Sequence, residues 1–209
     1  MTTDPYLAAV ALAPALGWAA HSLWMVRRLH AARLDPLTGL PTRHAFTVRA
    51  RRGLRRRELS VLLLDLDDFK LVNDTFGHAS GDRLLAAVAE QLHRWCAAHG
   101  GFAARIGGDE FAAVAEMGAQ DTADLAHVLL NTTVDVGHAH LTPVFSLGVC
   151  LPEDYPGACL AERLHAADQA MYAAKSLGSR WHIAGEHPTH RTAAGRRAGR
   201  HGTHAALSR

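Results

Sequence analysis

The sequence predicts an α/β fold, an α+β sandwich of the ferredoxin-like or palm type with a central antiparallel sheet and flanking helices. Three observations support this fold class. Short apolar runs alternate with helical periods from residue 43 to residue 184. The run at residues 59–66 is continuous and short, as expected for a fully buried strand. Two further apolar runs flank Gly107 and Gly108, which indicates a hairpin with a tight turn.

Residues 6–26 are an apolar stretch without a formal charge, and Arg27 and Arg28 follow it directly. The stretch is long enough to cross the hydrocarbon core of a bilayer, and its basic flank predicts that the following domain lies in the cytoplasm. We therefore expect residues 1–34 to form a single membrane anchor. Pro14 and His21 keep an alternative open, in which a soluble helix pairs with a second copy or packs on the domain.

A joint rich in proline and glycine at residues 35–43 separates this segment from a helix that begins near Thr42. The end of that helix carries many arginines, which raises the alternative of nucleic-acid binding. No aromatic residues interleave with them, and the formal net charge of the chain is only +2. A solvated helix end is therefore favoured, and no nucleic acid is expected among the partners.

The strand at 59–66 and the hairpin both end in carboxylates. Asp65 lies near the end of the strand, where a charge is costly unless it is paired, and a divalent cation is a common partner. Asp67 and Asp68 lie just beyond, and either of them suits a helix-capping acid for the turn that follows. Asp109 and Glu110 follow the two glycines, which leave room for a ligand to approach the backbone. The alternative for the hairpin is an ordinary turn with solvated acids.

The next segments predict a helix at 69–76, a loop at 77–82 and a longer helix that ends near residue 98. Asn73 and Asp82 could be a turn residue and a helix-start acid. They could equally meet a purine edge, because a carboxylate accepts from the paired amino and imino N–H groups that guanine offers.

The rest of the chain predicts a helix at 120–131, a strand at 141–151, a helix at 160–177 and an edge strand at 181–184. The globular domain is thus expected over residues 35–184. Residues 185–209 have no apolar period and are predicted to be a disordered basic tail.

Lysine is scarce in this chain. Of the 22 basic side chains, all but Lys70 and Lys175 are arginine, so these positions either need a compact ammonium or are lysine by chance. In the predicted sheet, Asp65 would neighbour the 109–110 hairpin tip. Carboxylates around one cation, facing lysines, are the groups that phosphoryl transfer from a nucleotide requires.

Five motifs make the chain resemble the GGDEF family of diguanylate cyclases, whose nucleotide cyclase fold is of the palm type. They are DPLTGLPTR at 35–43, LDLDDFKLVNDTFGHASGD at 64–82, RIGGDEF at 105–111, FSLGV at 145–149 and ADQAMYAAK at 167–175. The resemblance implies condensation of two GTP molecules into cyclic di-GMP and pyrophosphate by a homodimer. It also implies a Mg²⁺ cofactor, with Mn²⁺ as an alternative, held by Asp65, Asp109 and the Leu66 carbonyl.

The resemblance assigns further roles by position. Asp109 would serve as, or lie beside, the base for the 3′-hydroxyl, and Glu110 would hold the ribose or a second metal ion. Lys70 would stabilise the phosphates in the transition state. The remaining substrate-binding positions are Asn73 and Asp82 for guanine, Lys175 for the triphosphate, and His78 and Arg180.

Two positions depart from the family pattern. The window 98–101 lacks the Arg-x-x-Asp sequence of members with product inhibition, so feedback through that site is not expected. Ser179 occupies the place of a family arginine, with Arg180 one residue later. The alternative function is a catalytically weak GGDEF module that binds GTP as a sensor or interaction domain.

Overall fold

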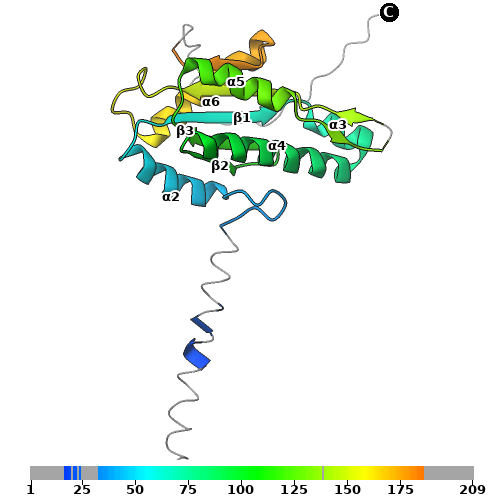
Figure 1. Ribbon diagram of the computed structural model, residues 1–209, viewed down its shortest axis with the longest axis horizontal. Helices are drawn as coiled ribbons and strands as arrows, with labels where there is room; N and C mark the ends of the chain where they lie inside the picture. Colours follow the sequence, from blue (N-terminus) through cyan, green and yellow to red (C-terminus); the bar gives the residue numbers. More distant parts are fainter. Residues whose placement is uncertain (1–16, 20, 23, 25–32, 138, 186–209) are drawn as a thin grey trace, which may run out of the picture.

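The computed structural model describes residues 17–19, 21–22, 24, 33–137 and 139–185 (Figure 1). Most of the predicted anchor at 6–26 and nearly all of the predicted tail lie outside the described residues, so both stay predictions. Among the residues that are described, no helix is long and apolar enough to span a bilayer.

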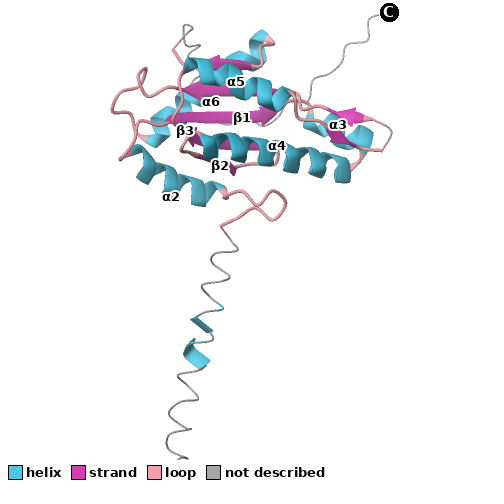
Figure 2. Cartoon of the chain, in the orientation of Figure 1, coloured by secondary structure: helices cyan, strands magenta, loops and turns pink. Residues whose placement is uncertain are grey.

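The predicted central strand is β1 (Ser60–Leu66), which lies in the middle of a five-stranded sheet. The strand order is β2-β3-β1-β6-β7, and all neighbours are antiparallel except β6 and β7, which are parallel. This confirms the predicted α+β fold with a mainly antiparallel sheet. Figure 2 shows the strands in magenta and the helices in cyan. The other strands are β2 (Phe102–Arg105), β3 (Glu110–Ala115), β6 (Phe145–Cys150) and β7 (Trp181–Ile183).

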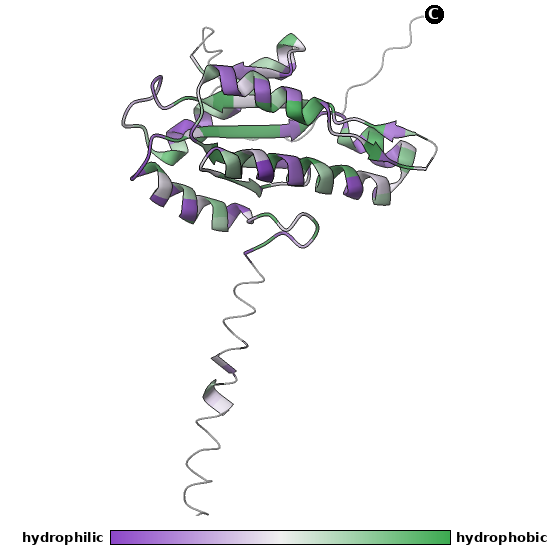
Figure 3. Ribbon diagram, in the orientation of Figure 1, coloured by the Kyte–Doolittle hydropathy of each residue, from purple (hydrophilic) through white to green (hydrophobic). Residues whose placement is uncertain are grey.

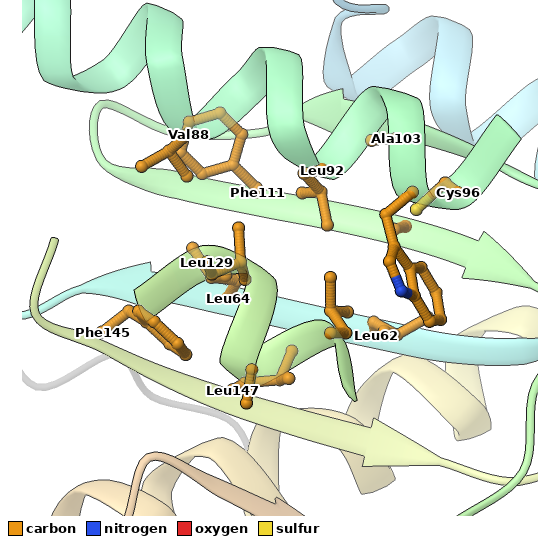
Figure 4. Packing of buried hydrophobic residues seen from close by; sticks show 14 of the residues in the cluster. Leu62, Leu64, Val88, Leu92, Cys96, Ala103, Phe111, Leu129, Phe145 and Leu147 are labelled. Atoms are coloured by element: carbon orange, nitrogen blue, oxygen red, sulfur yellow. The ribbon is translucent and has the colours of Figure 1, made fainter. Parts of the chain in front are cut away.

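Helices cover both faces of the sheet, and successive residues of β1 point to opposite faces. Leu62 and Leu64 pack with α4 (His78–Ala98) and α5 (Ala119–Leu130) (Figure 4). Val61 and Leu63 pack with α2 (Arg43–Leu54) and α6 (Leu160–Leu177). In Figure 3, β1 is hydrophobic over most of its length and hydrophilic at its end. The polar end of β1 is therefore the natural place for a site.

Two predicted boundaries were wrong. The predicted loop at 77–82 is the start of α4, because Gly77, with φ of 81°, ends α3 (Phe69–Phe76) and lets the next helix begin at once. The predicted strand at 141–151 is divided. Its first part is β5 (His140–Leu141), which pairs with β4 (Val134–Asp135), and β6 starts only after Pro143, which has no N–H to donate to a ladder.

The 35–43 joint is bonded to the hairpin between β2 and β3. The Asp35 carboxylate accepts from the Thr38 hydroxyl at 2.7 Å and from Arg105 Nη1 at 3.0 Å. Arg105 also donates from Nε and Nη2 to the Gly108 carbonyl at the hairpin tip, at 3.1 and 2.6 Å. On the other side of the tip, Arg43 donates to the Ile106 carbonyl at 2.9 and 2.7 Å. These contacts hold the glycine turn in one position.

Strand β6 and helix α6 approach each other closely at Gly148. A methyl group at this position would overlap the Ala167 carbonyl oxygen and the Met171 amide nitrogen. Since both are backbone atoms, neither can move aside without shifting the helix.

We therefore expect Gly148→Ala to lower the free energy of unfolding by about 3 kcal/mol, because the added methyl group forces α6 away from the sheet. Urea denaturation measures this value. Gly108→Ala is the control, since a methyl group there would meet nothing within 4 Å, and we expect a change within about 0.5 kcal/mol. Equal stability of the two variants would contradict the close contact.

The Asp35–Arg105 contact predicts a pH-dependent stability. Burial acts to raise the pKa of Asp35, but hydrogen bonds from Thr38 and Arg105 outweigh it, so the pKa lies below its ordinary value of 3.8. A lowered carboxyl pKa stabilises the folded state above the ordinary value, and this stabilisation is lost as the pH falls through the folded-state pKa.

We expect Asp35→Asn to cost about 1–2 kcal/mol near neutral pH, a difference that shrinks as the pH falls below 3.8. Urea denaturation at a series of pH values checks this. The exposed Asp124→Asn serves as the control and should show no such trend. A difference between wild type and Asp35→Asn that does not vary with pH would contradict the prediction.

Candidate functional site

The end of β1 and the tip of the hairpin lie side by side, as the sequence predicted. Asp65 is directly opposite Glu110 in the β1–β3 ladder. The Leu66 amide donates to the Asp109 carbonyl at 3.1 Å, which extends the pairing by one residue. Two carboxylate positions of the hairpin and one of β1 therefore meet at the same edge of the domain.

A lysine from α6 reaches into this group of carboxylates. Lys175 is in the last turn of α6, which ends where Gly178 adopts φ of 65°. Its Nζ atom lies 2.9 Å from Asp65 Oδ2 and 2.9 Å from Asp67 Oδ1. The resemblance assigned Lys175 to a triphosphate. In this structure it contacts carboxylates instead, so a positive charge already lies between the acids.

The sequence suggested Asp67 or Asp68 as the helix-capping acid, and Asp67, the second of these acids, is not at the cap position of α3. The residue before α3 is Asp68, in the left-handed region with φ of 52°. Asp67 accepts at Oδ2 from the Ser146 hydroxyl at 2.9 Å, and its amide donates to the Val144 carbonyl at 2.8 Å. The sequence signal for this role was the spacing of two from Asp65, which places both carboxylates on the same side of an extended chain.

The electrostatics of this cluster favour a further cation. Burial raises the pKa of Asp65, the charges of Asp109 and Asp67 add to the rise, and Lys175 opposes it. Burial alone would lower the pKa of Lys175, but its ion pairs with Asp65 and Asp67 outweigh burial and raise it. Negative charge thus exceeds positive charge among these groups, and a cation bound there would relieve the repulsion.

The donor atoms fit a hard cation such as Mg²⁺. The predicted ligands, the Asp65 and Asp109 carboxylates and the Leu66 carbonyl, all offer oxygen atoms, which Mg²⁺ prefers. Within the described part of the chain, no three His, Cys, Asp or Glu side chains converge to hold a metal ion by themselves. Mg²⁺ is commonly bound by one or two carboxylates together with substrate phosphates, so a partial protein shell of this kind suits it.

The predicted guanine-recognising pair lies where α3 meets α4. Asn73, half-buried on α3, contacts the first turn of α4, since a methyl group on Gly81 would collide with its side-chain oxygen. Asp82 follows Gly81 and is exposed. A side-chain amide and a carboxylate thus border the same helix junction, and glycine at position 81 is what allows the approach.

The other predicted substrate residues lie at the surface. Lys70 on α3 and His78 at the start of α4 are exposed, and no ion pair is recorded for either side chain. Arg180 is also exposed and meets the sheet through its carbonyl, which accepts from Leu147. The Ser179 hydroxyl lies within hydrogen-bond distance of the Ala174 and Trp181 carbonyls, at 3.3 and 3.2 Å, and its single hydrogen is shared between them. Ser179 therefore caps backbone groups, and the structure brings neither residue into contact with the acids.

The family model described as "Diguanylate cyclase, GGDEF domain" matches residues 32–180. The chain is 48% identical over 179 residues to a 19.3 kDa protein of Streptomyces ambofaciens, with 85% of this chain and 96% of that protein covered. It is 37% identical to the diguanylate cyclase DgcN of Escherichia coli, over 70% of this chain and 38% of DgcN. It therefore spans under two fifths of that enzyme's length.

Solved structures agree with this assignment. The coiled coil and GGDEF domain of DgcB from Caulobacter crescentus, solved with c-di-GMP, aligns with a TM-score of 0.70 at 28% identity, over 87% of this chain and 99% of that chain. The GGDEF domain of TpbB from Pseudomonas aeruginosa aligns with a TM-score of 0.62 at 34% identity, over 72% of this chain and 94% of that chain. The match over residues 32–180 and these relatives show that the chain belongs to the GGDEF domain family of diguanylate cyclases.

Proposed function

We propose that this protein is an active diguanylate cyclase that condenses two GTP molecules into cyclic di-GMP. The observation that supports this most directly is the meeting of Asp65 and Lys175 with the Asp109–Glu110 hairpin at one edge of the sheet. This arrangement places carboxylates that can bind a cation next to a lysine that can bind phosphate. Family membership supports the same reaction.

The proposed metal site consists of the Asp65 and Asp109 carboxylates and the Leu66 carbonyl. Mg²⁺ or Mn²⁺ bound there would bind phosphate oxygens and offset charge at the leaving group. Asp109 or a group beside it accepts the proton of the 3′-hydroxyl. The hydroxyl oxygen then forms a bond to the α-phosphorus of the other GTP while the bond to pyrophosphate breaks.

The remaining residues bind and orient the substrate. Glu110 holds the ribose or a second cation, and Lys70 stabilises the phosphates. Lys175 binds the triphosphate, with His78 and Arg180 as further substrate contacts. Each domain holds one GTP, so the reaction requires a homodimer. We propose that residues 6–26 assist by anchoring the chain to the membrane, with the domain in the cytoplasm, or by pairing two copies.

A second candidate function rests on Ser179. This serine stands where the family pattern has an arginine, and its hydroxyl is bonded to backbone carbonyls. The guanidinium that would bind phosphate from this position is therefore replaced by a hydroxyl that already hydrogen-bonds within the protein. A module that binds GTP with little turnover is the alternative that this feature favours.

Product analysis of the full-length protein with GTP and Mg²⁺ tests the function. We expect cyclic di-GMP and pyrophosphate from the wild type, with a loss of about a hundredfold or more in Asp65→Ala and in Asp109→Ala, because each removes a metal ligand. Asp124→Ala, an exposed acid on α5, is the control and should remain active.

The result also separates the two candidate functions. GTP binding without product in the wild type would sink the enzyme proposal and leave the binding module. Activity that survives in both metal-site variants would mean that the chemistry lies elsewhere.

Guanine recognition predicts a change in nucleotide preference. We expect Asp82→Asn to weaken GTP binding about tenfold or more and ITP binding by a smaller factor, because inosine keeps the imino N–H but lacks the amino group that the carboxylate also accepts from. Calorimetric titration with both nucleotides measures the ratio. Asp74→Asn, an exposed neighbour on α3, is the matched control. An unchanged GTP-to-ITP ratio in Asp82→Asn would exclude Asp82 from base recognition.

A further inference from the structure

We propose that Asp67, oriented by the buried Ser146 hydroxyl, is a positioning residue that holds Lys175 in place for the triphosphate. This inference rests on the proposed function, and it assigns a task to two residues that the family resemblance left without a role in substrate binding. It predicts that the Lys175 ammonium keeps Asp67 as its partner when Asp65 turns toward a cation.

The two carboxylates that contact Lys175 differ in how firmly they are held. Asp65 is at the end of β1, and Lys175 is the hydrogen-bond partner that the structure records for its carboxylate. Asp67 is fixed at its amide, which donates to Val144, and at Oδ2, which accepts from Ser146. Its Oδ1, the atom that faces Lys175, is buried from solvent. Asp67 is therefore the more rigid partner of the two.

Ser146 owes its position to the sheet. It lies opposite Asp65 in the β1–β6 ladder and is only 1% exposed. Its hydroxyl donates to Asp67 across the strand end, so the pairing of β1 with β6 sets the direction of the Asp67 carboxylate. The contacts therefore run from strand β6 through Ser146 and Asp67 to Lys175.

Such a hold on Lys175 has a physical use. The lysine side chain is 52% exposed and has a flexible stem, and ordering such a stem costs up to about 2 kcal/mol. The ion pair with Asp67 already orders the lysine side chain before the nucleotide binds, so less conformational entropy is lost on binding. An ammonium has three N–H donors, so an ion pair with Asp67 leaves at least two of them for phosphate oxygens once Asp65 has turned away.

The first test compares affinities for GTP and GMP with Mg²⁺ in the full-length protein. We expect Asp67→Asn to weaken GTP binding about tenfold and GMP binding less than about twofold, because only the triphosphate needs Lys175. Ser146→Ala should give a smaller change in the same direction. In a double-mutant cycle, Asp67→Asn should add little to Lys175→Ala, since both changes remove the same interaction.

Two matched controls separate positioning from structural damage. Asp68→Asn makes the same chemical change at the next residue, where asparagine tolerates the left-handed backbone. Ser60→Ala removes another buried serine hydroxyl of the sheet, one that bonds the Met117 carbonyl. Neither control should alter the ratio of GTP to GMP affinity. A parallel loss for both nucleotides in Asp67→Asn would indicate a structural role and overturn the proposal, and so would tighter GTP binding.

A second readout does not depend on nucleotide binding. Because Lys70 and Lys175 are the only lysines, an amine-reactive reagent followed by mass spectrometry reports on each one separately. We expect Lys175 to react more slowly than Lys70 in the wild type and several-fold faster in Asp67→Asn, with Lys70 unchanged. Equal Lys175 rates in wild type and Asp67→Asn would contradict the proposed hold.

These results keep the two proposals apart. A wild type that fails to bind GTP refutes the proposed function, while the labelling rates still decide whether Asp67 holds Lys175. A wild type that binds GTP and forms product, with Asp67→Asn unchanged in both affinity ratio and labelling, leaves the cyclase intact and refutes the positioning role.

Discussion

The burial of β1 is the constraint on which the rest of the structure depends. Strands β3 and β6 pair with both of its edges, and helices cover both of its faces, so its apolar side chains are removed from water on every side. An ionisable residue is tolerated only where this enclosure ends. The change from Leu64 to Asp65 marks that point, and the hairpin acids and Lys175 lie beside Asp65 there.

The polar groups at this open end come from distant parts of the chain. Lys175 arrives on α6, Ser146 on β6, and the hairpin acids on β3. Each is held by an element that also packs into the core, which limits how far its side chain can move. The joint at 35–43 adds a further hold, since Asp35 accepts from Arg105 at the end of β2, and Arg105 donates to the Gly108 carbonyl of the hairpin turn. Because the core fixes these elements, the side chains at this polar edge can hold a cation and phosphates in a well-defined geometry.

Glycines at three places decide how closely these elements approach. Gly148 allows α6 to lie against β6, and Gly81 allows the Asn73 side chain to meet α4. Gly77 lets α3 and α4 follow each other without a loop. These glycines affect the placement of predicted site residues: Asn73 beside Gly81, His78 after Gly77, and Lys175 on the helix that packs at Gly148.

The sequence by itself determined the fold class, the strand that carries Asp65, and the hairpin that carries Asp109 and Glu110, because apolar periodicity and turn residues are local signals. The scarcity of lysine in the sequence also singled out Lys70 and Lys175 as candidates for phosphate binding. The start of α4, the break before β6, and the contacts of Asp67 with Ser146 and Lys175 were decided only by the tertiary structure. These depend on which strands pair and which backbone groups are left to be bonded, and residues 67 and 146 become neighbours only after β1 and β6 have formed one sheet.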